Sequence, residues 1–322
     1  MTTALITGVG GQDGTLLARR LVDLGHEVWG LTPPGPHPSN LLPEQVRVVE
    51  GDLRDREGLS ALVRQIGPDQ IYNLAAISSV AQSWEQPALT GLVSGLGAVH
   101  VFEAALRLQE ETGREVRVVQ ASSSELFGSP ETSPQTEDTP IQPVSPYGAA
   151  KAYAHHMGQV FRSRGLPVSN LILFAHESPL RPPSFVTRKI TSGAARVANE
   201  GGVIALGNLA ARRDWGYAGD YVEAMRLAAE APEARDFVIG TGQTHSVEDF
   251  ARLALQRAGV SDWRSHIVVD PRFFRPVDPV EHVADATKAR EVLGWQPTVA
   301  FEGLVNMMVD ADLEDDSGMV NS

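Results

Sequence analysis

Tyr147 and Lys151 stand four residues apart in the segment Tyr147-Gly148-Ala149-Ala150-Lys151. On a helix, this spacing places the two side chains on one face. A phenol has an ordinary pKa near ~10, so it needs a neighbouring positive charge to act as a base at neutral pH. A serine run, Ser122-Ser123-Ser124, precedes the pair and can supply a hydroxyl that bonds a substrate oxygen. The pattern predicts acid–base catalysis with Tyr147 as the base.

Three glycines at the start of the chain form a second pattern. Gly8, Gly11 and Gly14 are spaced three residues apart between an apolar strand and a helix. The first glycine allows a tight turn, the second lets a pyrophosphate approach the backbone, and the third packs the helix on the strand. The amides at the helix N-terminus add a partial positive charge for that phosphate. The turn predicts a dinucleotide-binding site.

Other residues extend this predicted cofactor site. Asp52 follows the third expected strand and can accept a hydrogen bond from an adenine amino group, although it could instead cap the helix that follows. The second expected strand runs into Pro33 and Pro34, so it offers neither an acid for a ribose 2′-hydroxyl nor an arginine for a 2′-phosphate. The sequence leaves NAD and NADP open, and we expect NADP to gain little over NAD.

These residues need a scaffold, and the first half of the chain predicts one. Apolar strands expected at 3–7, 27–31, 46–50, 70–74, 116–121 and 168–174 alternate with amphipathic helices expected at 13–24, 56–65, 96–111 and 146–164. This rhythm predicts an α/β fold with a doubly wound parallel sheet, the Rossmann arrangement. Ligands of such sheets bind at the carboxyl ends of the strands, where the serine run lies.

The rhythm changes after Phe174. We expect helices at 186–199, 221–231 and 246–258, strands at 237–239 and 267–269, and a terminal helix after Glu302. Ser246 and Asp249 form a variant of the capping box. Residues 1–174, with 236–259 returning to them, are predicted to form the dinucleotide-binding domain. Residues 175–235 and 260–322 are predicted to form a smaller, interleaved C-terminal substrate lobe.

Composition excludes several kinds of site. The 322 residues contain no cysteine, which removes disulfides, thiolate catalysis and sulfur-bound zinc. The net charge of −13 argues against non-specific binding of nucleic acid through surface charge. No apolar run approaches the ~18 residues that span a bilayer, and there is no basic leader. We expect a cytoplasmic protein with no membrane or nucleic-acid partner and no metal, and we expect disorder from Asp312 to Ser322.

Several motifs together carry a resemblance that runs from residue 3 to about residue 300. The chain resembles an extended short-chain dehydrogenase/reductase, and within that group the GDP-mannose 4,6-dehydratases. The motifs are Gly8-Val9-Gly10-Gly11-Gln12-Asp13-Gly14, Ser122-Ser123-Ser124-Glu125-Leu126-Phe127-Gly128, Ser145-Pro146-Tyr147-Gly148-Ala149-Ala150-Lys151, His176-Glu177-Ser178-Pro179, Val186-Thr187-Arg188-Lys189, Leu206-Gly207-Asn208-Leu209, Arg213-Asp214-Trp215-Gly216 and Phe274-Arg275-Pro276.

The resemblance implies a catalytic group of four residues. Ser123 takes the hydroxyl position, Tyr147 is the base, Lys151 is its partner and Glu125 is a second acid/base. Hydride transfer from sugar C4 to the nicotinamide would make the C5 proton acidic, Glu125 would remove that proton, and water would leave across C5 and C6. Glu125 could alternatively be a strand-end acid that bonds nearby amides.

The resemblance also implies binding residues and partners. The cofactor-binding set is Gly8, Gly11, Gln12, Asp13, Gly14, Asp52, Leu53, Leu74, Ala75 and Ala76, together with Tyr147 and Lys151. The substrate-binding set is Ser83, Glu125, Arg188, Lys189, Asn208, Arg213 and Arg275. The implied cofactor is NADP, with NAD not excluded, the implied substrate is a GDP-sugar, and we expect a homodimer. His176 and Glu177 are interpreted as structural.

The chain departs from the family at three places that bear on these implications. Pro33 and Pro34 replace the family's paired arginines in a shortened loop, Ala175 replaces an asparagine, and the acidic pattern after Phe274-Arg275-Pro276 differs. Two other functions on the same scaffold stay open: a GDP-sugar 4-reductase, which needs no base at C5, and an epimerase. A catalytically silent dinucleotide sensor is a third alternative, although such proteins can lose the Tyr–Lys pair that this chain keeps.

Overall fold

A seven-stranded sheet organises the computed structural model, which describes residues 1–35, 41–274, 277 and 281–320. The strand order is β11-β6-β5-β4-β1-β2-β3, and every neighbouring pair is parallel. The strands are β1 (Thr3–Thr7), β2 (Glu27–Thr32), β3 (Arg47–Glu50), β4 (Gln70–Asn73), β5 (Arg117–Ser123), β6 (Val168–Leu173) and β11 (Phe237–Ile239). The order reverses between β1 and β4, which is where doubly wound sheets bind ligands. The predicted fold class is confirmed.

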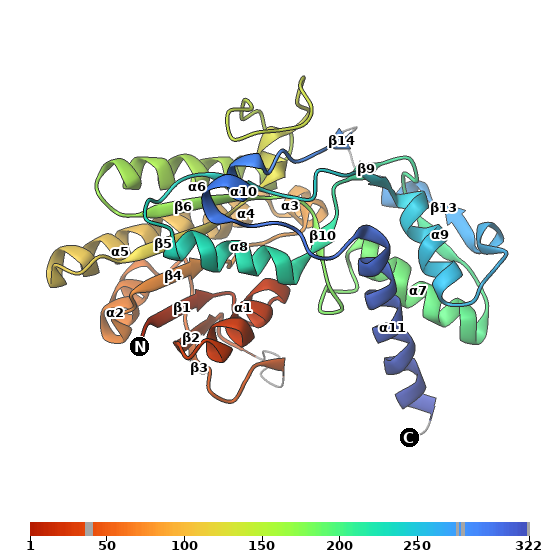
Figure 1. The fold of residues 1–322 in the computed structure, drawn as a ribbon, viewed down its shortest axis with the longest axis horizontal. Helices are drawn as coiled ribbons and strands as arrows, with labels where there is room; N and C mark the ends of the chain where they lie inside the picture. The colour runs from red at the N-terminus through yellow and green to blue at the C-terminus, as the bar shows by residue number, and fades with distance from the viewer. Residues whose placement is uncertain (36–40, 275–276, 278–280, 321–322) are drawn as a thin grey trace.

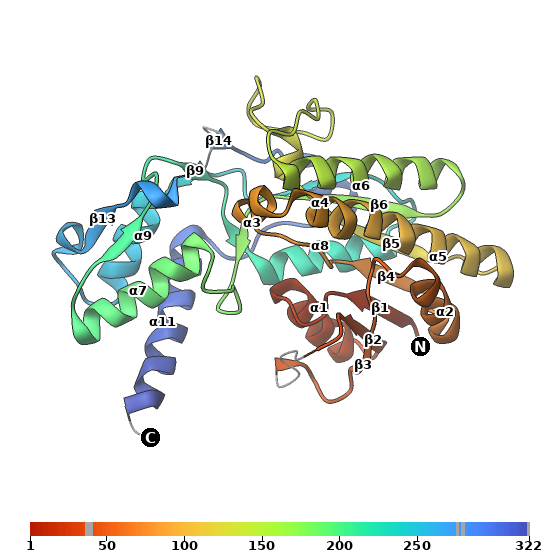
Figure 2. The same cartoon turned by 180° about the vertical axis from the view of Figure 1, so that it is seen from behind.

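Helices cover both faces of this sheet. One face, in front in Figure 1, carries α1 (Gln12–Asp23), α8 (Ala218–Glu230) and α10 (Thr287–Leu293). The other face, in front in Figure 2, carries α2 (Arg56–Ile66), α5 (Gly97–Thr112) and α6 (Pro146–Ser163). Each layer buries its own apolar cluster, because the strands are apolar on both sides and each helix turns one apolar stripe toward them.

A smaller core lies beside the sheet, at the right of Figure 1. It packs α7 (Val186–Glu200), α9 (Val247–Arg257) and α11 (Phe301–Val320) around Trp215, and the rings of Trp215 and Phe301 stack with centroids 6.0 Å apart. The capping box expected at the start of α9 is present: Ser246 accepts from the amide of Asp249, and Asp249 accepts from the amide of Ser246. Short strands of two or three residues lie at the edge of this core. One pair joins β8 (Ile204–Leu206) and β13 (Ile267–Val269), and a three-stranded sheet joins β9 (Arg212–Arg213) to β12 (His245–Ser246) and β14 (Glu281–His282).

Three helices pack on the side opposite to the one expected for them. Helices α8 and α10 lie on the sheet, while α9 packs on α7 and α11 in the smaller core. The expected boundaries followed position along the chain, whereas each helix packs against the apolar surface that its own apolar stripe matches. We propose that the smaller domain consists of α7, α9 and α11 with their short strands, and that α8 and α10 belong to the sheet.

The acidic segment for which we expected disorder is helical as far as Val320, and Asn321 and Ser322 lie outside the described residues. Helix α11 continues to Val320. The Asp312 side chain is only 5% exposed and its Oδ1 lies 2.6 Å from Nη2 of Arg188 on α7. The tail therefore gains an ion pair with another helix, which composition alone does not reveal.

A helical segment between β4 and α5 is longer than expected. It comprises α3 (Val80–Glu85), α4 (Pro87–Thr90) and a π-helical stretch, Gly91–Leu96, that continues into α5. The run Pro87–Thr112 is long and apolar enough to span a membrane by composition, which the sequence reading overlooked, but 67% of its apolar window is buried inside the fold. Such burial is typical of a core helix. The remaining elements are β7 (His176–Glu177) paired with β10 (Gly216–Tyr217), and the 3-10 turns Ser124–Phe127, Trp263–His266 and Pro271–Phe273.

Candidate active site

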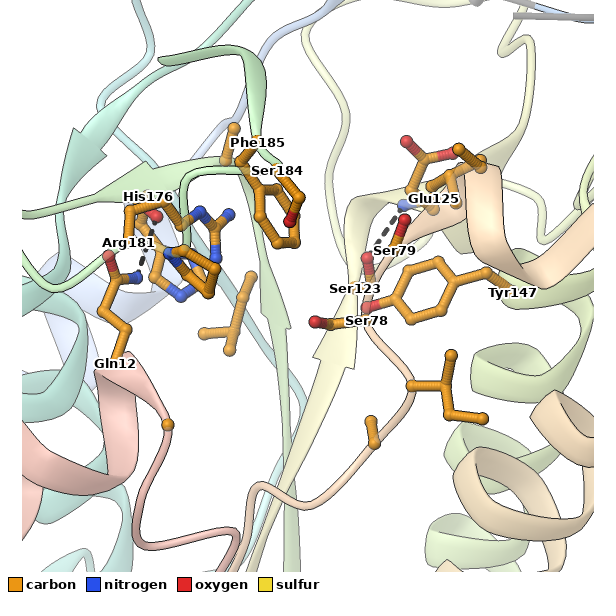
Figure 3. A pocket seen from close by; sticks show the side chains of 18 of the residues that line it. Gln12, Ser78, Ser79, Ser123, Glu125, Tyr147, His176, Arg181, Ser184 and Phe185 are labelled. Carbon is orange, nitrogen blue, oxygen red and sulfur yellow. Dashed lines mark hydrogen bonds between the residues drawn. The ribbon is translucent and has the colours of Figure 1, made fainter. Parts of the chain in front are cut away.

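A cavity of about 1060 Å³ opens at the carboxyl edge of the sheet and continues between the sheet and the smaller core. Its walls bring together most of the residues singled out from the sequence. Those are Gly8, Gly11, Gln12, Asp13, Gly14, Asp52, Leu53, Leu74, Ala75, Ala76, Ser123, Glu125, Tyr147, Lys151, Lys189, Asn208 and Arg213. In Figure 3, Ser78, Ser123 and Tyr147 face Gln12, His176 and Arg181 across the cavity.

The glycine turn has the close backbone packing that its spacing predicts. Gly8 has a φ of +71°, and a Cβ there would lie 2.9 Å from Cα of Ala75. A Cβ on Gly14 would lie 2.4 Å from the carbonyl oxygen of Gly8. Gly11 is the N-cap of α1 and offers no side chain to the first amides of the helix. Those amides are free of side-chain caps at the cavity wall, so the turn fits a pyrophosphate.

Helix α6 holds the tyrosine beside the serine run. Ser145 caps the helix by accepting a hydrogen bond from the amide of Gly148 at 3.0 Å. A Cβ on Gly148 would lie 2.5 Å from the carbonyl oxygen of Glu125, so the helix packs directly on the 3-10 turn that follows β5. Tyr147 and Ser123, each less than a tenth exposed, consequently lie next to each other at the cavity wall.

Burial sets the charge states of the Tyr–Lys pair. It raises the pKa of Tyr147 to about 12, although the hydrogen bond with Ser123 lowers it in part. Burial also lowers the pKa of Lys151 to about 8. The Lys151 ammonium donates to the carbonyl oxygen of Ala121 at 2.8 Å and lies 5.8 Å from the centroid of the tyrosine ring. The protein alone therefore keeps Tyr147 as a phenol, and ionisation needs a further positive charge in the cavity.

The opposite wall carries an ion pair that the sequence did not predict. His176 Nε2 lies 2.9 Å from Oδ2 of Asp13, and its Nδ1 lies 2.7 Å from the carbonyl oxygen of Phe174. Burial lowers the pKa of His176, but the Asp13 carboxylate outweighs it and leaves this pKa above its ordinary value. Burial likewise raises the pKa of Asp13, yet His176 brings it down to about 2. Gln12 reinforces the contact by donating to the His176 carbonyl oxygen at 3.1 Å (Figure 3).

The interpretation of His176 and Glu177 as structural was incomplete, because both also line the cavity. Glu177 pairs with Arg181 at 2.7 Å and accepts from the hydroxyl of Thr187 at 2.8 Å. Arg181, Ser78, Ser79 and Phe185 line the cavity too and were missed. Ser78 and Ser79 lie in the loop after β4, separated from Ala76 by Ile77, so their position shortly after a strand end was the available signal. No sequence pattern pointed to Arg181, since it lies in a proline-rich connection.

Two of the predicted substrate residues that the structure describes, Ser83 and Arg188, do not line the cavity. Ser83 is fully buried and donates to the carbonyl oxygen of Val80 at 2.7 Å, because α3 turns it inward. Arg188 points along α7 toward Asp312 and also donates to the carbonyl oxygen of Pro179. Arg275 lies outside the described residues.

Asp52 does not cap the helix that follows it, which was the alternative considered for this residue. It lines the cavity and accepts from the amide of Arg54 at 2.8 Å and from its guanidinium. The cap of α2 is Asp55, whose carboxylate accepts from the amide of Gly58.

The smaller core adds polar and cationic groups at the far end of the cavity. Lys189, the neighbour of Arg188, turns inward with its ammonium 3.2 Å from the ring centroid of Phe273. Asn208 and Arg213 line the same end. In a protein of net charge −13, these groups make this end of the cavity a candidate site for an anionic ligand.

Comparisons with known proteins agree with this geometry. The sequence profile of the GDP-mannose 4,6 dehydratase family matches residues 5–308. GDP-mannose 4,6 dehydratase 1 of Arabidopsis thaliana is 42% identical over 97% of this chain and 90% of its own length. The human GDP-mannose 4,6 dehydratase is 38% identical over 97% of this chain and 91% of its own. The solved structure of a dTDP-glucose 4,6-dehydratase from Streptomyces venezuelae with bound NAD superposes with a TM-score of 0.85, at 25% identity, over 98% of both chains. With a profile match over nearly its whole length, the chain belongs to the GDP-mannose 4,6-dehydratase family.

Proposed function

We propose that this protein converts GDP-mannose to GDP-4-keto-6-deoxymannose and water with a bound nicotinamide cofactor. One observation carries the proposal: Ser123, Glu125, Tyr147 and Lys151 line one wall of a cavity that also contains the glycine turn. A base for the sugar hydroxyl and a carboxylate for a second proton are therefore available within one site, as elimination requires.

The cofactor is proposed to lie along the carboxyl edge of the sheet. The uncapped amides of α1 would hold its pyrophosphate, Asp52 would accept from the adenine amino group, and Leu74, Ala75 and Ala76 would lie beside the nicotinamide ribose. When bound, the nicotinamide accepts hydride from sugar C4 and returns it to C6.

The residues of the chain supply the proton transfers. Tyr147 removes the proton of the 4-hydroxyl while Ser123 bonds the same oxygen. The buried phenol would ionise beside a bound, positively charged nicotinamide ring, and Lys151 would stabilise the phenolate. Glu125 takes the C5 proton once C4 is a ketone and gives it to the C6 hydroxyl, which leaves as water. The hydride that returns to C6 would be matched by a proton at C5, which balances the proton that Tyr147 took from the 4-hydroxyl. Lys189, Asn208 and Arg213 are proposed to bind the nucleotide diphosphate at the other end of the cavity.

The experiment is incubation of the purified protein with a panel of GDP- and UDP-sugars and a catalytic amount of oxidised cofactor. We expect loss of water from GDP-mannose by mass spectrometry, with flat absorbance of reduced nicotinamide over many turnovers. Stoichiometric consumption of added reduced cofactor would instead identify a GDP-sugar 4-reductase, and isomerisation without loss of mass would identify an epimerase.

We further propose a homodimer in the cytoplasm. Leu92 and Leu96 in the π-helical stretch are 47% and 37% exposed, and Tyr153 and Val160 on the adjacent α6 are 47% and 49% exposed. These large apolar side chains on two neighbouring helices favour association with a second copy. Light scattering after gel filtration tests this, and a monomer at micromolar concentration would contradict it.

A further inference from the structure

The segment 281–284 runs between the two ends of the cavity. Its strand β14 pairs in parallel with β9, so that His282 is the partner of Arg213, one of the groups at the far end of the cavity. Both strands lie between the sheet and the smaller core (Figure 1 and Figure 2). His282 is 2% exposed and also lines the cavity. A buried histidine is therefore placed where the two parts of the site meet.

The imidazole of His282 bonds to the turn that carries Glu125. Its Nε2 lies 2.7 Å from the carbonyl oxygen of Gly128, which directly follows the 3-10 turn Ser124–Phe127. Since a carbonyl oxygen can only accept, this nitrogen carries a proton and donates it. Gly128 is closely packed, because a Cβ there would clash with the carbonyl oxygen of Gln142. The bond therefore joins His282 to a tightly held backbone position three residues after Glu125.

The same segment also packs against the side chains of this turn. Ala284 belongs to a small apolar cluster with Leu126 and Phe127 of the turn and with Phe174, which follows β6. The His282 ring packs edge-on against Phe174, with centroids 6.4 Å apart. Both His282 and Ala284 consequently contact the turn or the residues that support it.

Asp214 fixes the segment to the strand of Arg213. Its carboxylate is buried and accepts from the amide of Ala284 at 3.1 Å and from two amides of the loop after β11 at 2.8 Å each. Asp214 directly follows Arg213 in the chain. The segment and the strand of Arg213 are therefore held together, and His282 connects both to the turn of Glu125.

We propose that His282 is a positioning residue for the elimination step: its hydrogen bond to Gly128 holds the turn of Glu125 at a fixed place in the cavity. Removal of the C5 proton needs the carboxylate within reach of that proton, and a misplacement of about 1 Å can cost about 10²-fold in rate. Tyr147 and Lys151, which serve the oxidation at C4, lie on α6 and should be less affected. The inference rests on the proposed dehydratase function.

Single-turnover absorbance measurements with GDP-mannose separate the two steps. In wild type, we expect reduced nicotinamide to form only briefly, since its hydride returns to C6. His282→Leu cannot donate to Gly128, so elimination should slow by about tenfold while oxidation at C4 stays within about threefold. Reduced-nicotinamide absorbance should therefore accumulate before it decays. His282→Gln, whose amide Nε2 can take the place of the imidazole Nε2, should keep both rates within about threefold of wild type.

Glu281→Gln is the matched control. Glu281 is the neighbour of His282 on β14 and pairs with Arg212 at 3.2 Å, but it does not line the cavity. Its absorbance trace should match that of wild type. All variants are compared well below the melting temperature of the least stable one. If His282→Leu does not fold, His282→Asn replaces it, because the shorter side chain cannot reach the Gly128 carbonyl.

Two results would overturn the inference. One is a His282→Leu variant that melts earlier but gives the absorbance trace of wild type, which would make the role of His282 purely structural. The other is a folded His282→Gln variant that stalls as His282→Leu does, because the hydrogen bond would then not be the cause. In both cases wild type would still lose water from GDP-mannose, and the proposed function would stand. Absence of water loss in wild type would overturn both.

Discussion

His176 and Asp13, separated by 163 positions in the chain, meet at 2.9 Å on the cavity wall opposite Tyr147. Both partners of the imidazole, the Asp13 carboxylate and the Phe174 carbonyl, are hydrogen-bond acceptors, so both ring nitrogens carry protons. The ring also stacks on Tyr221 with centroids 4.5 Å apart. The protonated ring of His176 therefore connects the start of α1, next to the glycine turn, to the segment that follows β6.

The first prediction follows from this ion pair. Because the pKa of His176 in the folded protein is above its ordinary value, its stabilising effect is complete below about pH 6.5 and is lost as the pH rises through the folded-state pKa. The melting temperature of wild type should exceed that of His176→Gln by more at pH 6 than at pH 9. Thermal scans at several pH values measure this, and a gap that does not change with pH would contradict the assignment.

The second prediction concerns the catalytic base. Tyr147→Phe keeps the buried ring and deletes the ionisable oxygen, so the fold and cofactor affinity should persist while turnover falls by roughly 10²- to 10⁴-fold. Steady-state assays with calorimetry of cofactor binding would check both points. Turnover within a few-fold of wild type would remove Tyr147 from the mechanism.

The third prediction separates dehydration from simple oxidation. Glu125→Gln should still allow oxidation at C4, because that step depends on Tyr147 and Lys151. Without the carboxylate, the reaction should stop before elimination, and a single-turnover experiment should show a lasting rise in reduced-nicotinamide absorbance. Solvent deuterium incorporation at C5 should fall in parallel. If water is still lost at the normal rate, Glu125 is not the C5 base.

The fourth prediction distinguishes two adjacent residues of α7. Arg188 is buried against Asp312, whereas Lys189 faces the cavity. Arg188→Met leaves a buried carboxylate without its partner, so it should lower the free energy of unfolding by about 2–4 kcal/mol. Lys189→Met should instead raise the KM for GDP-mannose by about tenfold while leaving the melting temperature near that of wild type. If Arg188→Met instead raised the KM and Lys189→Met lowered the free energy of unfolding, Arg188 would be the residue that reaches the substrate.

Short sequence motifs predicted the parts of the site whose geometry is set within one turn or one helix. The spacing of Gly8, Gly11 and Gly14 and of Tyr147 and Lys151 expresses contacts within one turn or one helix face, and the structure places all five at the cavity. The sheet followed from the same kind of evidence, because buried parallel strands are apolar along their whole length.

The errors arose where a side chain's direction depends on distant packing. Consecutive residues of a helix project about 100° apart, so a cavity-facing position for Lys189 does not imply one for Arg188. Only the packing of α11 on α7 decides which of them does. Ser83 was implied by the resemblance alone, and the start of α3, which turns its side chain inward, was not predicted. The partner of His176 lies at the other end of the domain, and no spacing along the chain points to it.

The repeated passage of the chain between the sheet and the smaller core has an evolutionary consequence. Helix α7 departs after β6, α8 and β11 return, α9 departs again, α10 returns, and α11 closes the smaller core. A single crossover after β6 would therefore transfer α7, α9 and α11 only together with α8, β11 and α10, which pack on the sheet. Exchange of the smaller core alone would need several junctions, so point substitutions and short loop changes disturb the sheet less when substrate preference diverges.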